Sequence, residues 1–481
     1  MAGLILQYAL AAILVLLALL SAQIAALGII RLYWPAPKVR APHLPDEVLP
    51  NVLIQLPVRN EGPLAARVAA AASRLDWPKN RLEIQVLDDG DAEDHERLKA
   101  EIAASVLPGS NVQVLRRGER TGFKAGNLAF GLKHCDAPYV AIFDADFVPP
   151  ADFLRRTVPV MLADQSVAFV QGRWTHANRN KNWLTRVQGL LLDSHFAVEQ
   201  EARFRAGLPL AFNGTAGIWR RKAIDTSGGW HGDTLTEDLD LSMRSILKGW
   251  RAVFLKDLEV PGELPETAAA WRAQQARWTK GQAQCAKKIL PQVWASEMPL
   301  WLKAVITMHM WLFAFYALAF WSGVISLVLM ALAVQYLHAV AALGLFVTAF
   351  GLSATFGYLY LGQYILGRHR MIGLHRSLLL ALVFPSGLIL SNARATYEAF
   401  FSSQMNFQRT LRPGERYAGG WRGGPELAAG LLLPVFAFAE QAWSAPFFMF
   451  AVAGLVSIGA MGRSGSAPER LAETRAPAKI E

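Results

Sequence analysis

The chain has 481 residues, of which 53% are hydrophobic and only 18% are charged, and its mean hydropathy is +0.24. This composition is too apolar for an ordinary soluble protein and indicates a membrane protein with one sizeable soluble domain. The formal net charge is +10, but the basic residues concentrate beside apolar segments, as the positive-inside rule requires, so nucleic acid is not an expected partner. Cys135 and Cys285 are too few for a disulfide framework or a metal cluster.

The first expected element is a membrane anchor at residues 1–31. Its uncharged apolar run, 4–30, is long enough to span a bilayer, and the basic residues follow the run rather than precede it. We therefore expect a signal-anchor whose N-terminus lies outside, not a cleaved signal peptide. A proline-rich connector leads into a soluble domain that should face the cytoplasm, with boundaries at 32–270.

The soluble domain alternates short apolar strands with helical segments. Strands are expected at 52–57, 84–87, 112–115, from Tyr139 toward Asp146, 167–172 and 252–254, and helices at 64–75, 93–106, 124–133 and 183–205. This rhythm predicts an α/β domain with a doubly wound, mostly parallel sheet.

The composition becomes strongly apolar beyond Trp301. Residues 271–300 are expected to form interfacial helices, 301–367 two transmembrane helices, and 427–462 a transmembrane hairpin. Between them, 368–426 should hold an interfacial or re-entrant helix and a cytoplasmic loop, because basic residues flank that apolar run on both sides. The sequence thus predicts five spanning helices, with six as the alternative, and a disordered basic tail at 463–481.

Two of the expected strands end in carboxylates. The strand that begins at Tyr139 ends at Asp144 and Asp146, and the second strand of the domain ends at Asp88 and Asp89. Open α/β sheets bind ligands outside the carboxyl ends of their strands. Hard oxygens there suit Mg²⁺ or Mn²⁺, which takes its other ligands from water and substrate phosphates. For an isolated Asp-x-Asp, a strand that ends in an Asx-type turn is the alternative.

A lysine follows a glycine turn at the start of an expected helix. Lys124 lies in the segment Thr-Gly-Phe-Lys-Ala-Gly-Asn at 121–127. A helix N-terminus together with a lysine is a good phosphate site. Many helices begin this way, so an ordinary helix start is the alternative.

Further along the chain lie a glycine-bearing loop and a candidate base. The loop Phe-Asn-Gly-Thr-Ala-Gly at 212–217 lets backbone approach a ligand closely, although alone it is better read as a turn. Transfer of a sugar with inversion needs a base opposite the leaving diphosphate, and Asp238 in Thr236-Glu237-Asp238 is the candidate. A helix cap at Thr236 is the alternative.

The last motif is Gln274-x-x-Arg277-Trp278, whose three named side chains lie on about one face of a helix. Trp278 offers a flat apolar face to a sugar ring, and Arg277 can stabilise a departing diphosphate. An amphipathic helix on the membrane surface is the alternative, and both descriptions can hold together.

Six motifs resemble, in this order, those of the processive family 2 glycosyltransferases, the cellulose synthases and their cellulose-synthase-like relatives. They are Asp88-Asp89, Lys124-Ala125-Gly126-Asn127, Asp144-Ala145-Asp146, Phe212-Asn213-Gly214-Thr215-Ala216-Gly217, Thr236-Glu237-Asp238 and Gln274-x-x-Arg277-Trp278. The Asn-Gly-Thr-Ala-Gly form is most similar to the plant glucomannan and glucan backbone synthases and their bacterial counterparts. The resemblance covers residues 51 to about 412.

The resemblance implies a cytoplasmic GT-A-type domain and a role for each matched residue. The donor would be bound by Asp88, Asp89, Lys124, Asp144, Gln274 and Arg277, and Mg²⁺ or Mn²⁺ by Asp144 and Asp146. The general base would be Asp238, the acceptor would meet Trp278, Asn213, Gly214, Thr215 and Glu237, and a gating loop would include Phe407, Arg409 and Thr410. Arg59 departs from the family, whose members often carry an aromatic residue there against the base.

The resemblance implies an inverting, metal-dependent, processive enzyme that makes a β-linked glucan from UDP-glucose and passes the polysaccharide through its own membrane channel. The implied location is a bacterial inner membrane, with the lipid bilayer, the donor and the growing chain as partners. A GDP-mannose-using mannan or glucomannan synthase is the close alternative. A non-processive enzyme that glycosylates a lipid is a further one, and a transporter or scaffold with a degenerate domain is the least favoured.

Overall fold

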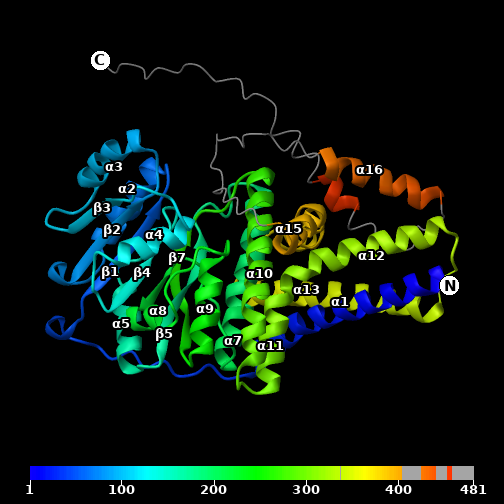
Figure 1. Cartoon of the computed structure of the whole chain (residues 1–481), viewed down its shortest axis with the longest axis horizontal. Helices are drawn as coiled ribbons and strands as arrows, with labels where there is room; N and C mark the ends of the chain where they lie inside the picture. The colour runs from blue at the N-terminus through cyan, green and yellow to red at the C-terminus, as the bar shows by residue number, and fades with distance from the viewer. Residues whose placement is uncertain (336, 403–423, 440–451, 458–481) are drawn as a thin grey trace, which may run out of the picture.

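The computed structural model describes residues 1–335, 337–402, 424–439 and 452–457. Figure 1 shows a sheet-containing domain at one end and a group of long helices at the other. The helix α10 (Ala268–Ala295) lies between the two parts and runs across the direction of the long helices. The predicted division into a soluble and an apolar half therefore has a visible counterpart in the structure.

The soluble half is built on one seven-stranded sheet with the order β3-β2-β1-β4-β6-β5-β7. The strands are β1 (Val52–Val58), β2 (Leu82–Asp88), β3 (Asn111–Arg116), β4 (Tyr139–Ile142), β5 (Val167–His176), β6 (Gly217–Arg220) and β7 (Arg251–Gly262). The predicted α/β class is confirmed. Continuous apolar runs form the central strands because helices cover both faces of the sheet.

The sheet is mostly parallel, as predicted, but it is mixed because it contains one antiparallel strand. Strand β6 lies between β4 and β5 and is antiparallel to both, whereas the pairs β1–β2, β1–β4, β2–β3 and β5–β7 are parallel. Strand β6 was not predicted, because this short strand begins at the last residue of the glycine-bearing loop at 212–217. The strand predicted from Tyr139 toward Asp146 is also shorter than expected, since β4 ends at Ile142 and leaves Asp144 and Asp146 in the following loop.

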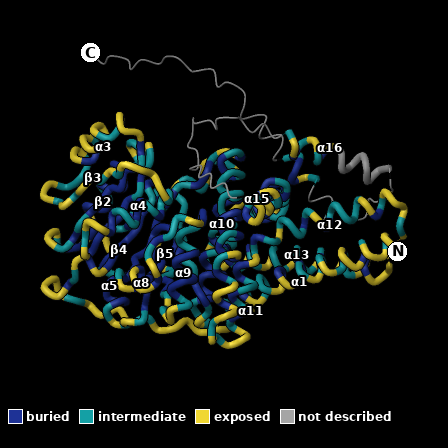
Figure 2. The backbone as a smooth tube through the Cα atoms, in the orientation of Figure 1, coloured by how far each residue is buried: buried dark blue, intermediate teal, exposed yellow. Residues whose placement is uncertain are grey.

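Alternate side chains of the sheet enter two separate cores. In β1, Val52, Ile54 and Leu56 belong to the core beneath α2 (Gly62–Ser73), α3 (Ala92–Ser105) and α5 (Phe153–Ala163). Leu53 belongs to the other core, under α4 (Phe123–Leu132), α8 (Arg221–Thr226) and α9 (Glu237–Leu247). Figure 2 shows that buried residues concentrate in this half of the molecule.

The helix predicted at 183–205 is confirmed, with one irregularity. It consists of α6 (Trp183–Ser194), a π-helical turn (His195–Gln200) and α7 (Glu201–Arg205). A capping box between Asn182 and Thr185 starts α6, because each side chain bonds the backbone N–H of the other. Isolated π-turns within α-helices are frequent at functional sites.

Four helical segments in the described part of the chain are long and apolar enough to cross a membrane. They are α1 (Ala2–Tyr33), α11 to α12 (Leu300–Ala331), α13 (His338–Ile365) and α14 to α15 (Leu374–Phe401). In the first three, the most apolar window is at most 22% buried inside the protein. Exposed apolar surface of this extent is rare on soluble monomers and identifies a membrane protein.

The predicted number of spans stays a prediction. The helix α16 (Gly424–Ala439) occupies the first arm of the expected hairpin, and most of the second arm lies outside the described residues. The segment Leu374–Phe401 is half buried in its apolar window, and α15 (Ile389–Phe401) is seen nearly end-on in Figure 1, across the direction of α12. The gating residues Phe407, Arg409 and Thr410 and the tail at 463–481 also fall outside the described part.

Candidate active site

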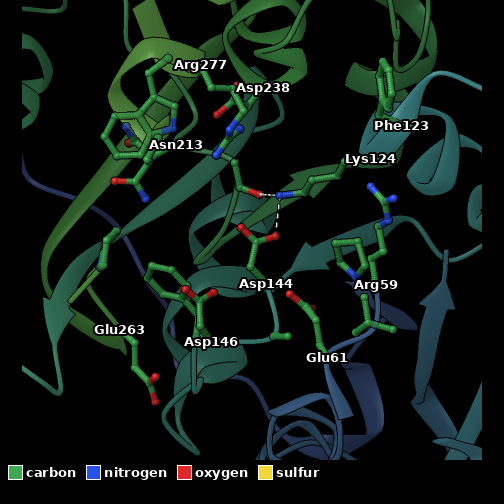
Figure 3. A pocket seen from close by; sticks show the side chains of 18 of the residues that line it. Arg59, Glu61, Phe123, Lys124, Asp144, Asp146, Asn213, Asp238, Glu263 and Arg277 are labelled. Atoms are coloured by element: carbon green, nitrogen blue, oxygen red, sulfur yellow. Dashed lines mark hydrogen bonds and ion pairs between the residues drawn. The ribbon is translucent and has the colours of Figure 1, made fainter. Parts of the chain in front are cut away.

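A cleft of about 290 Å³ opens where β1 and β4 end, and α10 closes one side of it. Most of the site residues predicted from the sequence line this cleft: Asp89, Lys124, Asp144, Asp146, Asn213, Gly214, Glu237, Asp238, Gln274, Arg277 and Trp278. These residues are spread over almost 200 positions of the chain. Figure 3 shows six of them around one space: Lys124, Asp144, Asp146, Asn213, Asp238 and Arg277.

Lys124 and Asp144 form the centre of the cleft. The Lys124 ammonium lies 2.5 Å from Asp144 Oδ1 and donates to the Gly214 carbonyl at 2.9 Å. Burial alone lowers the pKa of the Lys124 amine, but the charges of Asp144, Glu237 and Asp238 outweigh burial and raise it. Lys124 therefore stays a cation at physiological pH and balances the carboxylates around it.

The loop before α4 fixes the position of Lys124. Gly122 and Phe123 both have positive φ, at 72° and 50°, so the chain turns sharply just before the helix. A Cβ on Gly126 would lie 1.9 Å from the Thr121 carbonyl oxygen, which only glycine permits. The turn therefore places Lys124 in the first turn of α4, where its side chain reaches the cleft.

Asp144 and Asp146 fit a divalent cation by the chemistry of their donor atoms. Both carboxylates line the cleft within one loop after β4, and the Asp144 backbone N–H donates to Thr215 Oγ1 at 2.9 Å, which fixes the loop. Mg²⁺ and Mn²⁺ favour such oxygen ligands and complete their shell with phosphate and water. The cation that now compensates Asp144 is the Lys124 ammonium.

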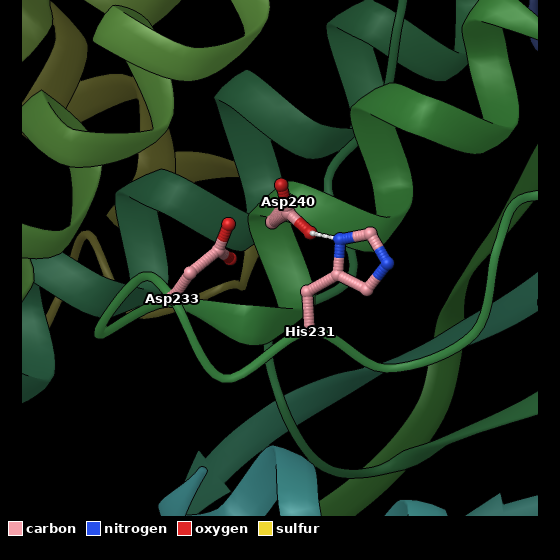
Figure 4. Close-up of side chains that lie close together, drawn as sticks. All are labelled: His231, Asp233 and Asp240. Atoms are coloured by element: carbon pink, nitrogen blue, oxygen red, sulfur yellow. Dashed lines mark ion pairs between the residues drawn. The ribbon is translucent and has the colours of Figure 1, made fainter.

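A second acidic group lies outside the cleft and is a structural charge cluster. His231, Asp233 and Asp240 bring their ligand atoms within 4.8 Å of one another (Figure 4). The Lys288 ammonium already lies 2.7 Å from Asp233 and 2.9 Å from Asp240, and Arg244 pairs with Asp240 at 2.6 Å. With two cations in place, this group carries no metal assignment.

Asp238 is a carboxylate of the cleft whose pKa is strongly raised. It lies in the first turn of α9, and its Oδ1 accepts the Leu239 N–H at 2.9 Å. Burial and the charge of Glu237 raise the pKa of Asp238 to about 7, against the lowering effects of Lys124 and Arg277. A carboxylate with such a pKa is protonated and deprotonated near neutral pH, as a general base must be.

Asp89 is already paired by a residue that the sequence analysis did not single out. Arg117 binds both carboxylate oxygens of Asp89 at 2.7 Å, and these two side chains are only 7% and 10% exposed. Arg117 also donates to the carbonyls of Thr121 and Phe123, on either side of the turn before Lys124. One arginine thus connects the end of β2 to the phosphate-type loop.

We expect Arg117→Met to destabilise the protein and weaken donor binding. Removing one partner of a buried ion pair leaves the other charge uncompensated, at a cost of about 3–5 kcal/mol. The check is the melting temperature together with donor affinity. The control is Arg97→Met, because Arg97 is 66% exposed in its surface ion pair with Asp94 and should contribute little. Equal melting temperatures for both variants would contradict the expectation.

Two predicted contact residues do not line the cleft, and their roles are corrected. The Asp88 side chain is 3% exposed, accepts the Gly90 N–H at 2.7 Å and pairs with His95 at 2.7 Å. Thr215 is fully buried and accepts the N–H of Asp144. Asp88 therefore holds the turn after β2, and Thr215 holds the Asp144 loop. Neither side chain is placed to touch a substrate.

The remaining predicted residues come from the loop at 212–217 and from α10. Gln274, Arg277 and Trp278 all line the cleft, so the prediction that they share one helical face is confirmed. Gly214 has φ +80°, and a Cβ there would lie 3.0 Å from Asp238 Oδ2. The backbone of this loop thus passes directly beside the candidate base.

Several other residues of the cleft went unnoticed in the sequence. Besides Arg59, which was noted as a departure, the cleft is lined by Phe123, Arg120, Trp174, His176, Glu263 and Glu266. In Figure 3 Phe123 and Arg59 lie on the same side of the cleft as Lys124, opposite Glu263. The aromatic ring of Phe123 could have been noticed from its place beside Lys124, but the others carry no local signal in the sequence.

Comparisons with known proteins show similarity to glycosyltransferases, both in sequence and in fold. Residues 139–360 match the model of glycosyl transferase family group 2. A mannosyltransferase from Pyrobaculum calidifontis, solved in complex with GDP-Man and Mn²⁺, superposes with a TM-score of 0.53 at 22% identity, covering 74% of this chain and 98% of that one. This likeness shows the GT-A-type fold. Residues 139–360 are thus similar to family 2 glycosyltransferases.

More similar in sequence are plant polysaccharide enzymes. Glucomannan 4-beta-mannosyltransferase 7 of Arabidopsis thaliana is 43% identical over 261 residues, which cover 53% of this chain and 47% of the relative. Glucomannan 4-beta-mannosyltransferase 1 of Oryza sativa subsp. japonica is 41% identical over 292 residues, 58% of this chain and 56% of the relative. The chain thus spans about half the length of the curated relatives it matches.

Proposed function

We propose that the protein is a membrane-embedded, metal-dependent, inverting glycosyltransferase that polymerises a β-linked mannan or glucomannan from GDP-mannose. The observation that carries the proposal is the cleft itself, which combines a carboxylate with a pKa of about 7, Asp238, with a lysine and two acidic residues suited to a metal diphosphate. The mannosyltransferase names of relatives that are more than 40% identical favour GDP-mannose over UDP-glucose.

In this proposal the donor lies along the Lys124 side of the cleft. Asp144 and Asp146 would hold Mn²⁺ or Mg²⁺, which when bound would supply positive charge to the diphosphate. The N-terminus of α4 and the Lys124 ammonium face the same phosphates, and Lys124 moves its hydrogen bond from Asp144 to them. Phe123 and Arg59 offer the base a ring and a planar guanidinium on which to stack. Asp89 with Arg117 supports this end of the site.

The acceptor then lies between α9 and α10. Asp238, in its ionised form, takes the proton from the acceptor hydroxyl as that oxygen attacks the sugar carbon opposite the departing diphosphate. Trp278 provides a flat apolar surface for the terminal sugar, and Arg277 faces the developing negative charge. Gln274 and Glu237 supply hydrogen-bonding groups around them. One displacement inverts the anomeric carbon and gives a β-linked product.

Processivity and export are part of the proposal. The helix α10 carries Gln274, Arg277 and Trp278 and packs against α15 and α11, so the proposed acceptor end of the cleft lies beside the membrane-type helices. A growing chain that stays bound at Trp278 has a short path into that bundle. The gating loop at Phe407, Arg409 and Thr410 remains a prediction from the family resemblance.

The test is sugar incorporation by the purified full chain in detergent or vesicles with Mn²⁺. Labelled GDP-mannose and UDP-glucose are offered separately and together, and product is counted as alcohol-insoluble polymer and in a lipid extract. We expect polymer from GDP-mannose. Polymer formed only from UDP-glucose would contradict the choice of GDP-mannose and indicate a glucan synthase. Label found only in the lipid extract would contradict a polymerising function.

A further inference from the structure

Asn213 lines the cleft, and its side chain is hydrogen-bonded by two side chains of the π-helical turn. Its Oδ1 accepts from Gln200 Nε2 at 2.6 Å, and its Nδ2 lies 3.2 Å from His195 Nε2. The i→i+5 winding of a π-turn brings His195 and Gln200 to nearly the same side of the helix, which a regular α-helix would not. The irregularity in this helix therefore has a specific consequence at the cleft.

The direction of the hydrogen bonds that join Gln200, Asn213 and His195 follows from the contacts of Gln200. Gln200 Nε2 is also 3.1 Å from the Ala211 carbonyl, which can only accept, so this atom is the amide nitrogen. The atom of Asn213 that faces Gln200 must then be its oxygen, and the atom that faces His195 must be its nitrogen. His195 Nε2 therefore accepts, and its proton resides on Nδ1.

The contact between His195 and Glu199 also requires a proton on His195 Nδ1. His195 Nδ1 lies 3.0 Å from Glu199 Oε2, and Arg203 donates to the other oxygen of Glu199 at 3.1 Å. Burial alone raises the pKa of Glu199, but the hydrogen bond from His195 and the charge of Arg203 lower it. An ionised carboxylate only accepts, so His195 Nδ1 must donate. The contacts of His195 with Asn213 and with Glu199 therefore indicate the same tautomer of His195.

Asn213 is thus held in a single orientation. Its backbone N–H donates to Gln171 Oε1 at 3.0 Å, and one N–H of its amide is directed at His195. The second amide N–H remains for the cleft, where the Asn213 side chain lies beside Arg277 and Asp238 (Figure 3). A planar amide fixed on two sides presents this donor at a defined position without losing further conformational freedom.

We propose that His195 and Gln200 are positioning residues that orient Asn213 to donate a hydrogen bond to the acceptor sugar. This inference rests on the proposed function, because it assigns the sugar side of the same cleft. It also gives the π-turn a purpose, since the turn brings both residues to Asn213 at once. The π-turn is further tied to the membrane anchor, because Arg31 of α1 donates to the Ala197 carbonyl at 2.9 Å.

The test is a double-mutant cycle on the full chain with GDP-mannose, Mn²⁺ and a β-1,4-linked mannan oligosaccharide as acceptor. We expect His195→Ala and Asn213→Ala each to raise the KM for the acceptor about tenfold, the effect of one lost hydrogen bond. Donor affinity should stay within about twofold. Because His195 acts through Asn213, the double variant should be no worse than Asn213→Ala alone. His195→Gln, whose amide oxygen can accept in place of Nε2, should recover most of the loss.

A matched control is His134→Ala, since His134 is exposed on the same domain and does not line the cleft. Losses that multiply in the double variant, or an equal loss of donor binding, would overturn the positioning role. If the wild type uses only UDP-glucose, the donor assignment fails, and the same cycle with a β-glucan oligosaccharide still decides the role of His195. Without transfer from either donor, ¹⁵N resonances decide it, and a proton on His195 Nε2 would overturn the inference.

Discussion

Asp238→Asn is expected to reduce sugar transfer by about 10²–10⁴-fold while leaving metal and donor binding intact. The amide has nearly the same shape as the carboxylate but cannot take the proton from the acceptor hydroxyl. Transfer is measured as polymer formed per enzyme, and donor binding by titration with GDP-mannose in the presence of Mn²⁺. Retention of more than about a tenth of wild-type transfer would exclude Asp238 as the base.

The same residue should set the acid limb of the pH profile. A base acts only when deprotonated, and the pKa of Asp238 is raised to about 7, so kcat/KM should fall as the pH drops below about 7. Because the charge of Glu237 contributes to this raised pKa, Glu237→Gln should move the acid limb to lower pH. An acid limb that stays in place would show that another group controls it.

The raised pKa of Asp238 also determines the direction in which the stability of the fold changes with pH. The folded state raises the pKa of Asp238, so folding favours its protonated form, and the stabilisation is lost as the pH rises through about 7. At pH 8 the ionised, buried carboxylate therefore opposes folding. Asp238→Asn should leave the melting temperature at that pH unchanged or higher, which separates loss of the base from loss of the fold.

The second large effect is expected for Asp144→Asn. This variant removes one of the two carboxylates proposed to hold the metal and also the closest partner of Lys124. Transfer should fall on the order of 10³-fold, because a metal held there would stabilise the negative charge that develops on the diphosphate by several kcal/mol. Donor binding should lose its dependence on Mn²⁺, which titration with and without the metal measures directly.

A matched control for the loss of charge is Asp257→Asn. Asp257 is 74% exposed, pairs with its neighbour Lys256 and does not line the cleft. This variant should keep both transfer and metal-dependent binding. Mn²⁺-dependent donor binding that survives in Asp144→Asn would mean that the metal is held elsewhere, and the cluster of His231, Asp233 and Asp240 would then need testing.

The sequence predicted the parts of the fold whose signals are local and strong. Long apolar runs gave the membrane-type helices, and alternating strands and helices gave the α/β domain, because burial on both faces leaves a continuous apolar pattern. The strand β6 was missed because four residues after a glycine-rich loop do not show a period. Its antiparallel insertion is a consequence of tertiary pairing with β4 and β5, which no local pattern carries.

The site was predicted where chemistry and spacing coincide, and missed where partners are distant in the chain. Lys124, Asp144 and Asp238 stood out as charged groups at the ends of elements. Asp88 was indistinguishable from Asp89 in the sequence, yet the Asp88 side chain is buried and pairs with His95. Arg117 carried no signal of its own, since its value lies in a pair with Asp89 across 28 positions.

The most direct measurement is the identity of the bond in the product. The purified full chain is given labelled GDP-mannose and Mn²⁺, and the alcohol-insoluble material is digested with an endo-β-1,4-mannanase, with Asp238→Asn treated in parallel. The proposed function predicts label released as short mannan oligosaccharides from the wild type and almost none formed by the variant. Polymer that resists the mannanase but yields to a β-glucanase after feeding with UDP-glucose would contradict it.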